Sequence, residues 1–520
     1  MVDISRRTLL LGAGAASLVG GFQAGAPHAE GGAQPSLPIP PELRANADGV
    51  MTLDARPGSM RFLADRETAT YGVNGPYLGP AIRVRRGERV TMHVTNSLPE
   101  ATTMHWHGLI IPGSADGGPH QIIAPGMSWR TELSIDQPAA TLWFHPHDYP
   151  RTAQQVIKGL AGLLIVDDEQ TAGLPLPSQW GVDDIPLILQ DRRFTPEGQF
   201  FDKRNLMAVT NGYVGDAMLV NGAHYPETRT ARGWLRLRML NGSNARSYAL
   251  AASDGRSLYV IGSDGGLLDS PVELKQLTIH VGERFEALVD ARDGAAFDLV
   301  TLPVSQEIMR LPPFGGPLPL ETIRPDGAEG KGRLPTRLAA LPPLPAALPP
   351  VSQQLVMDMF KDAAGMMALK KAGLMTMGGG GMIDPAVVSR VTELILSEPE
   401  MSESDQLSAN GVNGRPFSMD RIDFGAARNQ DLRWRISEGS DRMLHPVHVH
   451  GCQFRIVSMD GKSPPAYRAG WKDLAPISAG GVTEILVRFP CSAGADSPYM
   501  AHCHILEHED SGMMAQFTVS

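Results

Sequence analysis

Residues 220–241 begin with Val-Asn-Gly and end with Trp-Leu-Arg-Leu-Arg-Met-Leu-Asn, and this combination occurs three times in the chain. Val-Asn-Gly is found again at 73–75 and at 412–414, each time followed within 20 residues by a run of alternating apolar and polar side chains, at 89–96 and 432–437. Alternation of this kind is typical of half-buried strands. The repeat therefore predicts three copies of one β-domain.

The spacing of the copies indicates an insertion before the third. The first two copies are 147 residues apart, but the second and third are 192 apart. Residues 341–350 read LPPLPAALPP, a stiff linker in which proline disfavours sheet pairing, and seven methionines crowd into residues 355–382. We therefore expect an all-β chain of antiparallel sandwich domains at 45–170, 171–340 and 341–520, with a short Met-rich helical insertion in the third.

Length and charge exclude several classes of protein. A chain of 520 residues is too long for one hydrophobic core, which agrees with a multi-domain arrangement. The net charge of −10 provides no basic excess to release counterions from a polyanion, so a nucleic-acid partner is not expected.

The N-terminus carries an export signal. Arg6 and Arg7 precede an uncharged stretch that ends near Ala26 and is too short to span a bilayer. We expect a twin-arginine signal peptide over residues 1–29, with cleavage between about 24 and 30. With no later spanning segment, the mature protein is expected to be soluble in the periplasm and monomeric.

Ten of the 15 histidines fall into four tight groups. The groups contain the following residues: His105 and His107; His145 and His147; His445, His448 and His450; His502, His504 and His508. On a strand, residues i and i+2 project from one face, so each His-x-His pair directs two imidazoles into the same space. The four pairs 105/107, 145/147, 448/450 and 502/504 supply eight nitrogen donors, a number that fits three copper ions.

Cys503 lies between His502 and His504, so strand alternation directs its sulfur to the opposite side. This predicts a second metal site, with His445 and His508 as partners and Met513 as a weak axial ligand, in the arrangement of blue-copper electron-transfer proteins. A zinc site would need only four ligands and gives no reason for a thiolate between histidines. The other cysteines, Cys452 and Cys491, could pair in an oxidising compartment, but their geometry is not readable from sequence.

These motifs make the chain resemble a three-domain bacterial multicopper oxidase over its whole mature length. The resemblance implies cupredoxin-like Greek-key domains, a second domain without copper ligands, and four copper ions. It assigns His105 and His448 to the type 2 copper. It assigns the type 3 and type 1 ligands as follows: His107, His145 and His504 to one type 3 copper; His147, His450 and His502 to the other; His445, Cys503, His508 and Met513 to type 1.

The reaction that this resemblance implies takes single electrons from a reductant and passes four to O2, giving water. Four protons are consumed for each O2, so carboxylates are needed near the cluster. Asp116 and Glu509 match the positions to which the family assigns proton delivery. Asp116 in a Gly-rich segment could equally form a turn.

The Met-rich insertion is similar to that of the periplasmic copper-efflux oxidase, which oxidises Cu(I). Thioether sulfur prefers Cu(I), and the resemblance implies a labile substrate-copper site formed by Met357, Asp362, Asp441 and Met443. This insertion has comparatively few methionines and lacks histidines, and its methionines also fit a packing helix at about 357–377.

Two alternatives remain open. One is laccase-like oxidation of phenols or aryl amines, with small aromatic reductants in place of Cu(I). The other is a non-catalytic relative, either a structural cell-envelope protein or a copper-sequestering module, against which the complete ligand set argues.

Overall fold

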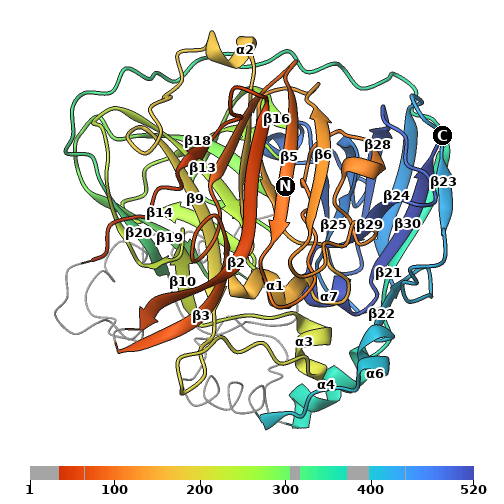
Figure 1. The fold of residues 1–520 in the computed structure, drawn as a ribbon. Coiled ribbons are helices and arrows are strands. Elements are labelled where there is room, and N and C mark those ends of the chain that lie inside the picture. Colours follow the sequence, from red (N-terminus) through yellow and green to blue (C-terminus); the bar gives the residue numbers. More distant parts are fainter. Residues whose placement is uncertain (1–33, 64, 305–316, 372–396, 440) are drawn as a thin grey trace, which may run out of the picture. The chain divides into compact units, whose positions relative to one another are not determined.

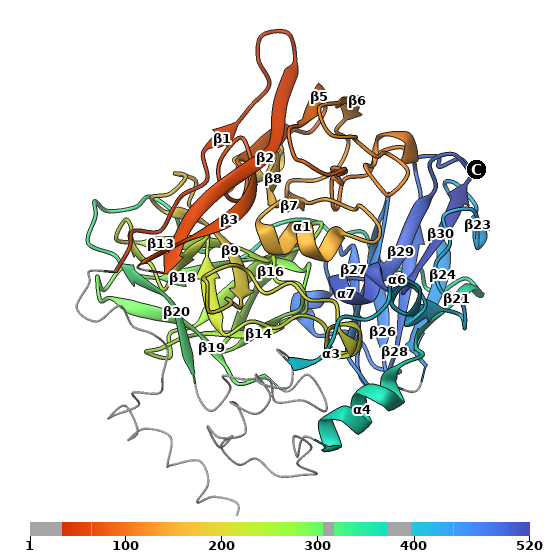
Figure 2. The ribbon, with the colours of Figure 1, turned by 60° about the horizontal axis from the view of Figure 1, so that its bottom comes forward.

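Strands build three pairs of facing sheets in the computed structural model, which describes residues 34–63, 65–304, 317–371, 397–439 and 441–520 (Figures 1 and 2). The export signal expected at 1–29 lies outside these residues. Each pair of sheets encloses its own cluster of buried apolar side chains, as in a sandwich. The all-β, cupredoxin-like fold expected from the sequence is confirmed.

The first sandwich pairs sheet β3-β2-β5-β6 with sheet β1-β4-β8-β7. Their strands are β1 (Glu42–Leu43), β2 (Val50–Leu63), β3 (Arg66–Val73), β4 (Ala81–Arg85), β5 (Arg89–Asn96), β6 (Ser128–Ser134), β7 (Ala140–Phe144) and β8 (Gly162–Asp167). β2 and β3 form a long antiparallel hairpin. Phe62 near its end packs on Phe194 and Phe200, which joins the hairpin to the second domain.

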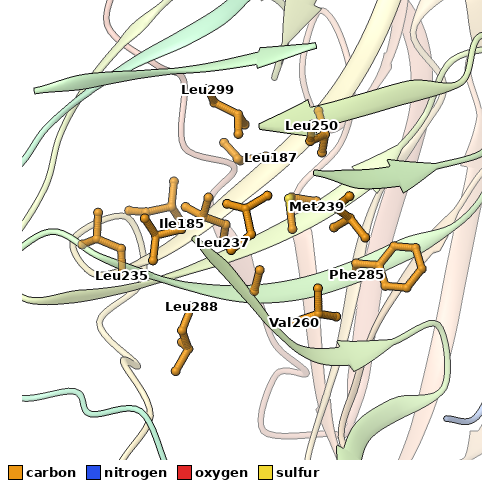
Figure 3. Close-up of a cluster of buried hydrophobic side chains, with 14 of the residues drawn as sticks. Ile185, Leu187, Leu235, Leu237, Met239, Leu250, Val260, Phe285, Leu288 and Leu299 are labelled. Atoms are coloured by element: carbon orange, nitrogen blue, oxygen red, sulfur yellow. The ribbon is translucent and has the colours of Figure 1, made fainter. Parts of the chain in front are cut away.

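The second sandwich pairs a seven-stranded sheet, β11-β10-β9-β13-β18-β15-β16, with a five-stranded sheet, β12-β20-β19-β14-β17. The strands of its first half are β9 (Asp184–Arg192), β10 (Ala217–Val220), β11 (Ala223–His224), β12 (Glu227–Arg229), β13 (Trp234–Asn241) and β14 (Tyr248–Ala252). Those of its second half are β15 (Leu258–Ser263), β16 (Gly266–Leu274), β17 (Leu277–Ile279), β18 (Arg284–Asp290), β19 (Phe297–Leu302) and β20 (Leu318–Arg324). Leu187, Leu237, Phe285 and Leu299 lie at the centre of its core (Figure 3).

The third sandwich pairs sheet β22-β21-β24-β28-β26 with sheet β23-β30-β29-β25-β27. Its strands are β21 (Val351–Met359), β22 (Asn410–Val412), β23 (Phe424–Ala426), β24 (Leu432–Glu438), β25 (His445–Val449), β26 (Gln453–Met459), β27 (Leu474–Ile477), β28 (Val482–Arg488), β29 (Tyr499–Cys503) and β30 (Met514–Val519). The short helices of the described residues are η1 (Gly113–Ala115), α1 (Thr152–Lys158), α2 (Glu169–Ala172), α3 (Leu206–Asn211), α4 (Asp362–Lys371), α6 (Glu403–Leu407), η2 (Ala466–Arg468) and α7 (Leu506–Asp510).

The Val-Asn-Gly repeat has the same structural role in all three domains. Asn74, Asn221 and Asn413 have φ values of 58°, 50° and 53°, a left-handed conformation that asparagine tolerates. Each asparagine side chain accepts a hydrogen bond from one backbone N–H of β2, β9 or β21. It also donates a hydrogen bond to a backbone carbonyl of the same strand, two residues before that N–H. The asparagine thus holds β2, β9 or β21 in place, and the repeat strand of the same domain pairs with that strand.

The sheets are mixed, and the expectation of antiparallel sandwiches is wrong in this respect. The repeat strands β5, β13 and β24 each pair in parallel with an earlier strand, respectively β2, β9 and β21. On its other side, each pairs antiparallel with a later strand. Alternation shows which face of a strand is buried, but both kinds of pairing bury the same face, so the pattern cannot distinguish them.

The start of the Met-rich segment also differs from expectation. Met357 and Met359 lie on strand β21, and the helix begins only at Asp362 and is described as far as Lys371. The expected continuation through Met375, Met377 and Met382 lies outside the described residues. Among the described helices, none has the length and apolar character needed to cross a membrane.

Glu321 is an isolated carboxyl group in the second sandwich. It is fully buried on β20, and the hydroxyl of Thr228 donates to its Oε1. Burial raises the pKa of Glu321 to about 8 from 4.5. The folded protein therefore retains a proton that the unfolded chain loses, and the stability falls as the pH rises from 4.5 to about 8.

We predict that Glu321→Gln removes this dependence. The variant should gain stability relative to the parent protein by roughly 1 kcal/mol per pH unit across that interval, because the amide carries no titrating proton. Melting temperatures at several pH values check this. The surface variant Glu273→Gln is the control, since Glu273 is exposed on β16. Parallel melting profiles for Glu321→Gln and the parent would contradict the assignment.

Candidate metal centres

The grouped histidines lie at or near the ends of strands in the first and third domains, where these two domains meet. His105 and His145 form a bridge beyond β7, and His147 follows in the adjoining loop. In the third domain, the clustered residues lie on or just beyond neighbouring strands: His445 and His448 on β25, His450 after it, His502 and Cys503 on β29, and His504 after it. The pairs are therefore only partly in strand conformation, unlike the continuous strands expected.

Eight imidazoles form one buried group, which we call the histidine cluster: His105, His107, His145, His147, His448, His450, His502 and His504. Within it, ligand-type nitrogen atoms lie within 4.8 Å of one another in three sets: His105, His107 and His448; His107, His145 and His504; His147, His450 and His502. The two domains interdigitate, because His105 stacks on His450 at 4.0 Å and His107 on His448 at 3.7 Å between ring centroids. No single domain contains the cluster.

Burial keeps six of these imidazoles neutral. It lowers the pKa of His107, His145, His448, His450 and His504 well below the ordinary value, and charge repulsion from neighbouring histidines lowers it further. For His147, burial lowers the pKa to about 3. Neutral imidazole is the form that binds metal.

Several buried nitrogen atoms in the cluster have no partner within the protein, and this tests whether metal ions fit. Nε2 of His105 and of His448 and both ring nitrogens of His504 are fully buried without a hydrogen bond. Such orphaned groups are costly unless something else satisfies them. An all-imidazole donor set that turns bare nitrogens inward fits copper.

The outward nitrogens of the cluster are held by acceptors. Oδ2 of Asp116 lies 2.7 Å from Nδ1 of His450, and the backbone carbonyl of Asp116 accepts from Nδ1 of His105 at 2.9 Å. Glu509 lies 3.4 Å from Nδ1 of His147 and 3.2 Å from Nδ1 of His502. Burial raises the pKa of Glu509, but His147 and His502 outweigh this effect and lower it to about 2.

A second group, the thiolate centre, comprises His445, Cys503 and His508. Sγ of Cys503 lies 3.5 Å from Nδ1 of His445 and 3.6 Å from Nδ1 of His508, and all three side chains are fully buried. Met513 is also buried, and its carbonyl accepts from the backbone N–H of Cys503. Cys503 thus belongs to a different group from His502 and His504, as alternation along β29 requires.

The four residues expected to bind substrate copper lie around the loop after β24. Asp441 accepts from Nε2 of His445 at 3.1 Å, and both Asp441 and Met443 are buried. Asp362 is the first residue of α4. Burial and the nearby charge of Asp441 raise the pKa of Asp362. Met357 pairs with Glu438 in the β21–β24 register and is fully buried in the third core.

Three charged residues near these centres carry no sequence signal that reveals them. Oδ1 of Asp473 lies 3.1 Å from Nε2 of His107, and Arg284 pairs with Asp473. The charge of Glu438 also raises the pKa of Asp362. None of the three lies within a histidine motif, so only the fold brings them to the site. Cys452 and Cys491, whose pairing the sequence leaves open, are both free thiols.

Comparison with known proteins agrees with this geometry. Three multicopper oxidase family models match residues 54–171, 197–308 and 391–520. The chain belongs to the multicopper oxidase family. Membership implies copper as cofactor and O2 as oxidant, which fits the buried histidine groups.

Relatives with different names cover nearly the whole chain. A multicopper oxidase of Staphylococcus aureus is 33% identical over 93% of this chain and 91% of its own length. Cell division protein FtsP of Xenorhabdus nematophila is 33% identical over 100% of this chain and 99% of its own.

Solved structures of multicopper oxidases share the fold. The laccase-like multicopper oxidase CueO of Ochrobactrum sp. is 39% identical, with a TM-score of 0.79, over 93% of this chain and 100% of that one. A metallo-oxidase of Campylobacter jejuni is 25% identical, with a TM-score of 0.76, over 95% of this chain and 97% of that one.

We predict that Cys503→Ser, loaded with copper, loses the intense visible absorption of a copper–thiolate bond, because serine provides no thiolate. Reductant-driven O2 uptake should disappear with it. Absorption spectra and an oxygen electrode measure the two effects. Cys491→Ser, which replaces a half-buried cysteine outside both groups, is the control and should remain blue. A blue Cys503→Ser protein would show that another residue supplies the thiolate.

Proposed function

We propose that this chain couples one-electron oxidation of a reductant at the thiolate centre to four-electron reduction of O2 to water at the histidine cluster, with Cu(I) as its physiological reductant. One observation carries the proposal: Cys503 belongs to the thiolate centre while its sequence neighbours His502 and His504 belong to the histidine cluster. A purely structural or copper-storing protein has no need for this covalent connection.

The copper ligands are proposed as the sequence predicts them. His105 and His448, whose orphaned Nε2 atoms face the cluster, would hold the type 2 ion. The two other histidine sets, 107/145/504 and 147/450/502, would hold the type 3 pair, and the thiolate centre with Met513 would hold type 1. Bound copper would supply single-electron transfer at the thiolate centre and deliver four electrons to O2 at the cluster.

The chain's own carboxylates would supply protons. Asp116 and Glu509 are buried, and each contacts the outward nitrogen of a cluster histidine. They are therefore placed to pass protons to the edge of the cluster when oxygen is reduced. The two lie against different histidines, Asp116 on His105 and His450, and Glu509 on His147 and His502.

We predict that Glu509→Gln slows O2 consumption by about 100-fold or more, because the amide cannot transfer a proton. Anaerobic bleaching of the blue colour by reductant should keep its rate, since that step uses only the thiolate centre. Stopped-flow spectroscopy separates bleaching from reoxidation. Glu403→Gln is the control, since Glu403 is exposed on α6. Equal slowing in both variants would remove Glu509 from proton delivery.

Cu(I) as reductant is supported by the residues around His445. Met443 offers a soft thioether, and Asp441 connects directly to His445 through its hydrogen bond. Asp362 adds a second carboxylate from α4, and these groups together suit a cation. The His445 ring is fully buried, so a bulky aromatic reductant cannot stack directly on it.

We predict that Asp362→Asn and Met443→Ala lower the rate of Cu(I) oxidation at least about 10-fold, as loss of a metal-contacting group does. Oxidation of a small dye should change much less, because neither residue belongs to the thiolate centre. Oxygen consumption with each reductant measures both rates. Asp405→Asn is the control, since Asp405 pairs with Lys361 at the exposed surface. Equal losses on both reductants would exclude a dedicated Cu(I) site.

Two named relatives favour other functions. The Ochrobactrum protein is described as laccase-like, with activity towards lignin model compounds, which supports phenols as reductants. The FtsP relatives are named for cell division, which supports a structural role. O2 uptake with Cu(I) and with a phenol distinguishes all three: faster turnover of the phenol favours the laccase, and no uptake by copper-loaded protein favours the structural role. An export signal at residues 1–29 would place either activity in the periplasm.

A further inference from the structure

Two buried charges join all three domains at the histidine cluster. Asp473 precedes β27 in the third domain, and Arg284 begins β18 in the second. Both side chains are fully buried. Nη1 of Arg284 donates to Oδ1 of Asp473 at 2.8 Å, and Nη2 donates to Oδ2, so the pair is bidentate. Such a fork fixes the carboxylate in position as well as balancing its charge.

Asp473 holds the outward nitrogens of two stacked histidines. Its Oδ1 lies 3.1 Å from Nε2 of His107, and its backbone carbonyl lies 2.8 Å from Nδ1 of His448. The two rings stack at 3.7 Å, with an interplanar angle of 14°. One residue therefore sets the orientation of an imidazole from the first domain and one from the third.

His107 depends on this contact more than its neighbours do. Its Nδ1 faces the cluster, 3.4 Å from Nε2 of His145, whereas His105, His145 and His448 turn Nδ1 outward to backbone carbonyls. A half-turn of the ring would replace Nδ1 by a carbon atom at the metal position. The hydrogen bond from Nε2 to Asp473 selects the orientation that keeps Nδ1 inward.

Arg284 is itself held rigidly. Its Nη1 also donates to the carbonyl of Gly282 at 2.9 Å, and its Nε to that of Thr141 on β7 at 3.2 Å. Gly108, directly after His107, has a φ of +92°, and a Cβ there would lie 2.6 Å from Asp473 Oδ2 and 2.9 Å from Arg284 Nη2. The ion pair thus packs against the backbone that carries His107, and no side chain fits between them.

We propose that Arg284 and Asp473 are a positioning pair, through which the second domain, which provides none of the cluster histidines, sets the metal-binding geometry of His107 and His448. The proposal rests on the copper ligands proposed above. The pair touches ligands and not the reacting oxygen, so it acts on copper retention first and on turnover only as a consequence.

The test compares Arg284→Gln and the isosteric Asp473→Asn with Arg238→Gln. Arg238 is a matched control: it is a buried arginine of the second domain that pairs with Asp184 and Glu286 and reaches the Thr141 hydroxyl, but contacts no histidine. Copper per blue centre is measured after loading, which counts only protein with an intact thiolate centre. Competition with a chelator then gives the affinity of the cluster ions.

Arg284→Gln and Asp473→Asn are expected to remain blue but to bind cluster copper about 10- to 100-fold more weakly than the parent. Arg238→Gln is expected to melt at lower temperature with full copper retention. Unchanged affinity in both cluster variants, or an equal loss in Arg238→Gln, would overturn the positioning role. A parent protein that binds a single copper ion would instead contradict the proposed function, so the two failures are distinguishable.

Discussion

Strand alternation at His502, Cys503 and His504 is the constraint on which the rest of the site depends. Because β29 places Cys503 opposite Val447 and His502 opposite His448, the thiol enters the third core while the imidazole joins the cluster. Two centres are thereby fixed at a distance set by the backbone of three residues. The other proposed ligands then come from outside this strand. They are His445 and His448 on β25, His450 just after it, His508 on α7, and four histidines of the first domain.

Assembly of eight imidazoles in one buried space requires acceptors for their outward nitrogens. Backbone carbonyls of Pro146, Asp116 and Asp473 accept from some, and the carboxylates of Asp116, Glu509 and Asp473 contact others. These carboxylates have different surroundings, since the side chain of Asp473 is bound to Arg284 whereas both oxygens of Glu509 lack any hydrogen bond other than the long contacts to histidine. This difference agrees with the roles proposed for them, in which Asp473 positions ligands and Glu509 delivers protons.

The sequence predicts those features that depend on local pattern. Asn221 and its two counterparts identify the repeated domain, and the His-x-His pairs identify the cluster, because spacing along one segment determines which side chains share a face. Strand direction is beyond such patterns, as the parallel pairing of β5 with β2 shows. Met357, expected in a helix, lies on β21 because apolar side chains there complete the third core. The contact between Arg284 and Asp473 joins residues 189 positions apart, and nothing in either neighbourhood encodes it.

The second domain, which contributes no cluster histidine, contacts residues that adjoin both centres. At the thiolate centre, Glu507 on α7 accepts from Tyr213 and Asn244 of the second domain, and the backbone of Asn244 accepts from Leu506. These bonds fix the helix that carries His508. At the cluster, Arg284 fixes Asp473. A ligand set divided between the first and third domains is only as precise as the alignment of those domains. Contacts from the second domain provide that alignment, because they are buried where water cannot compete.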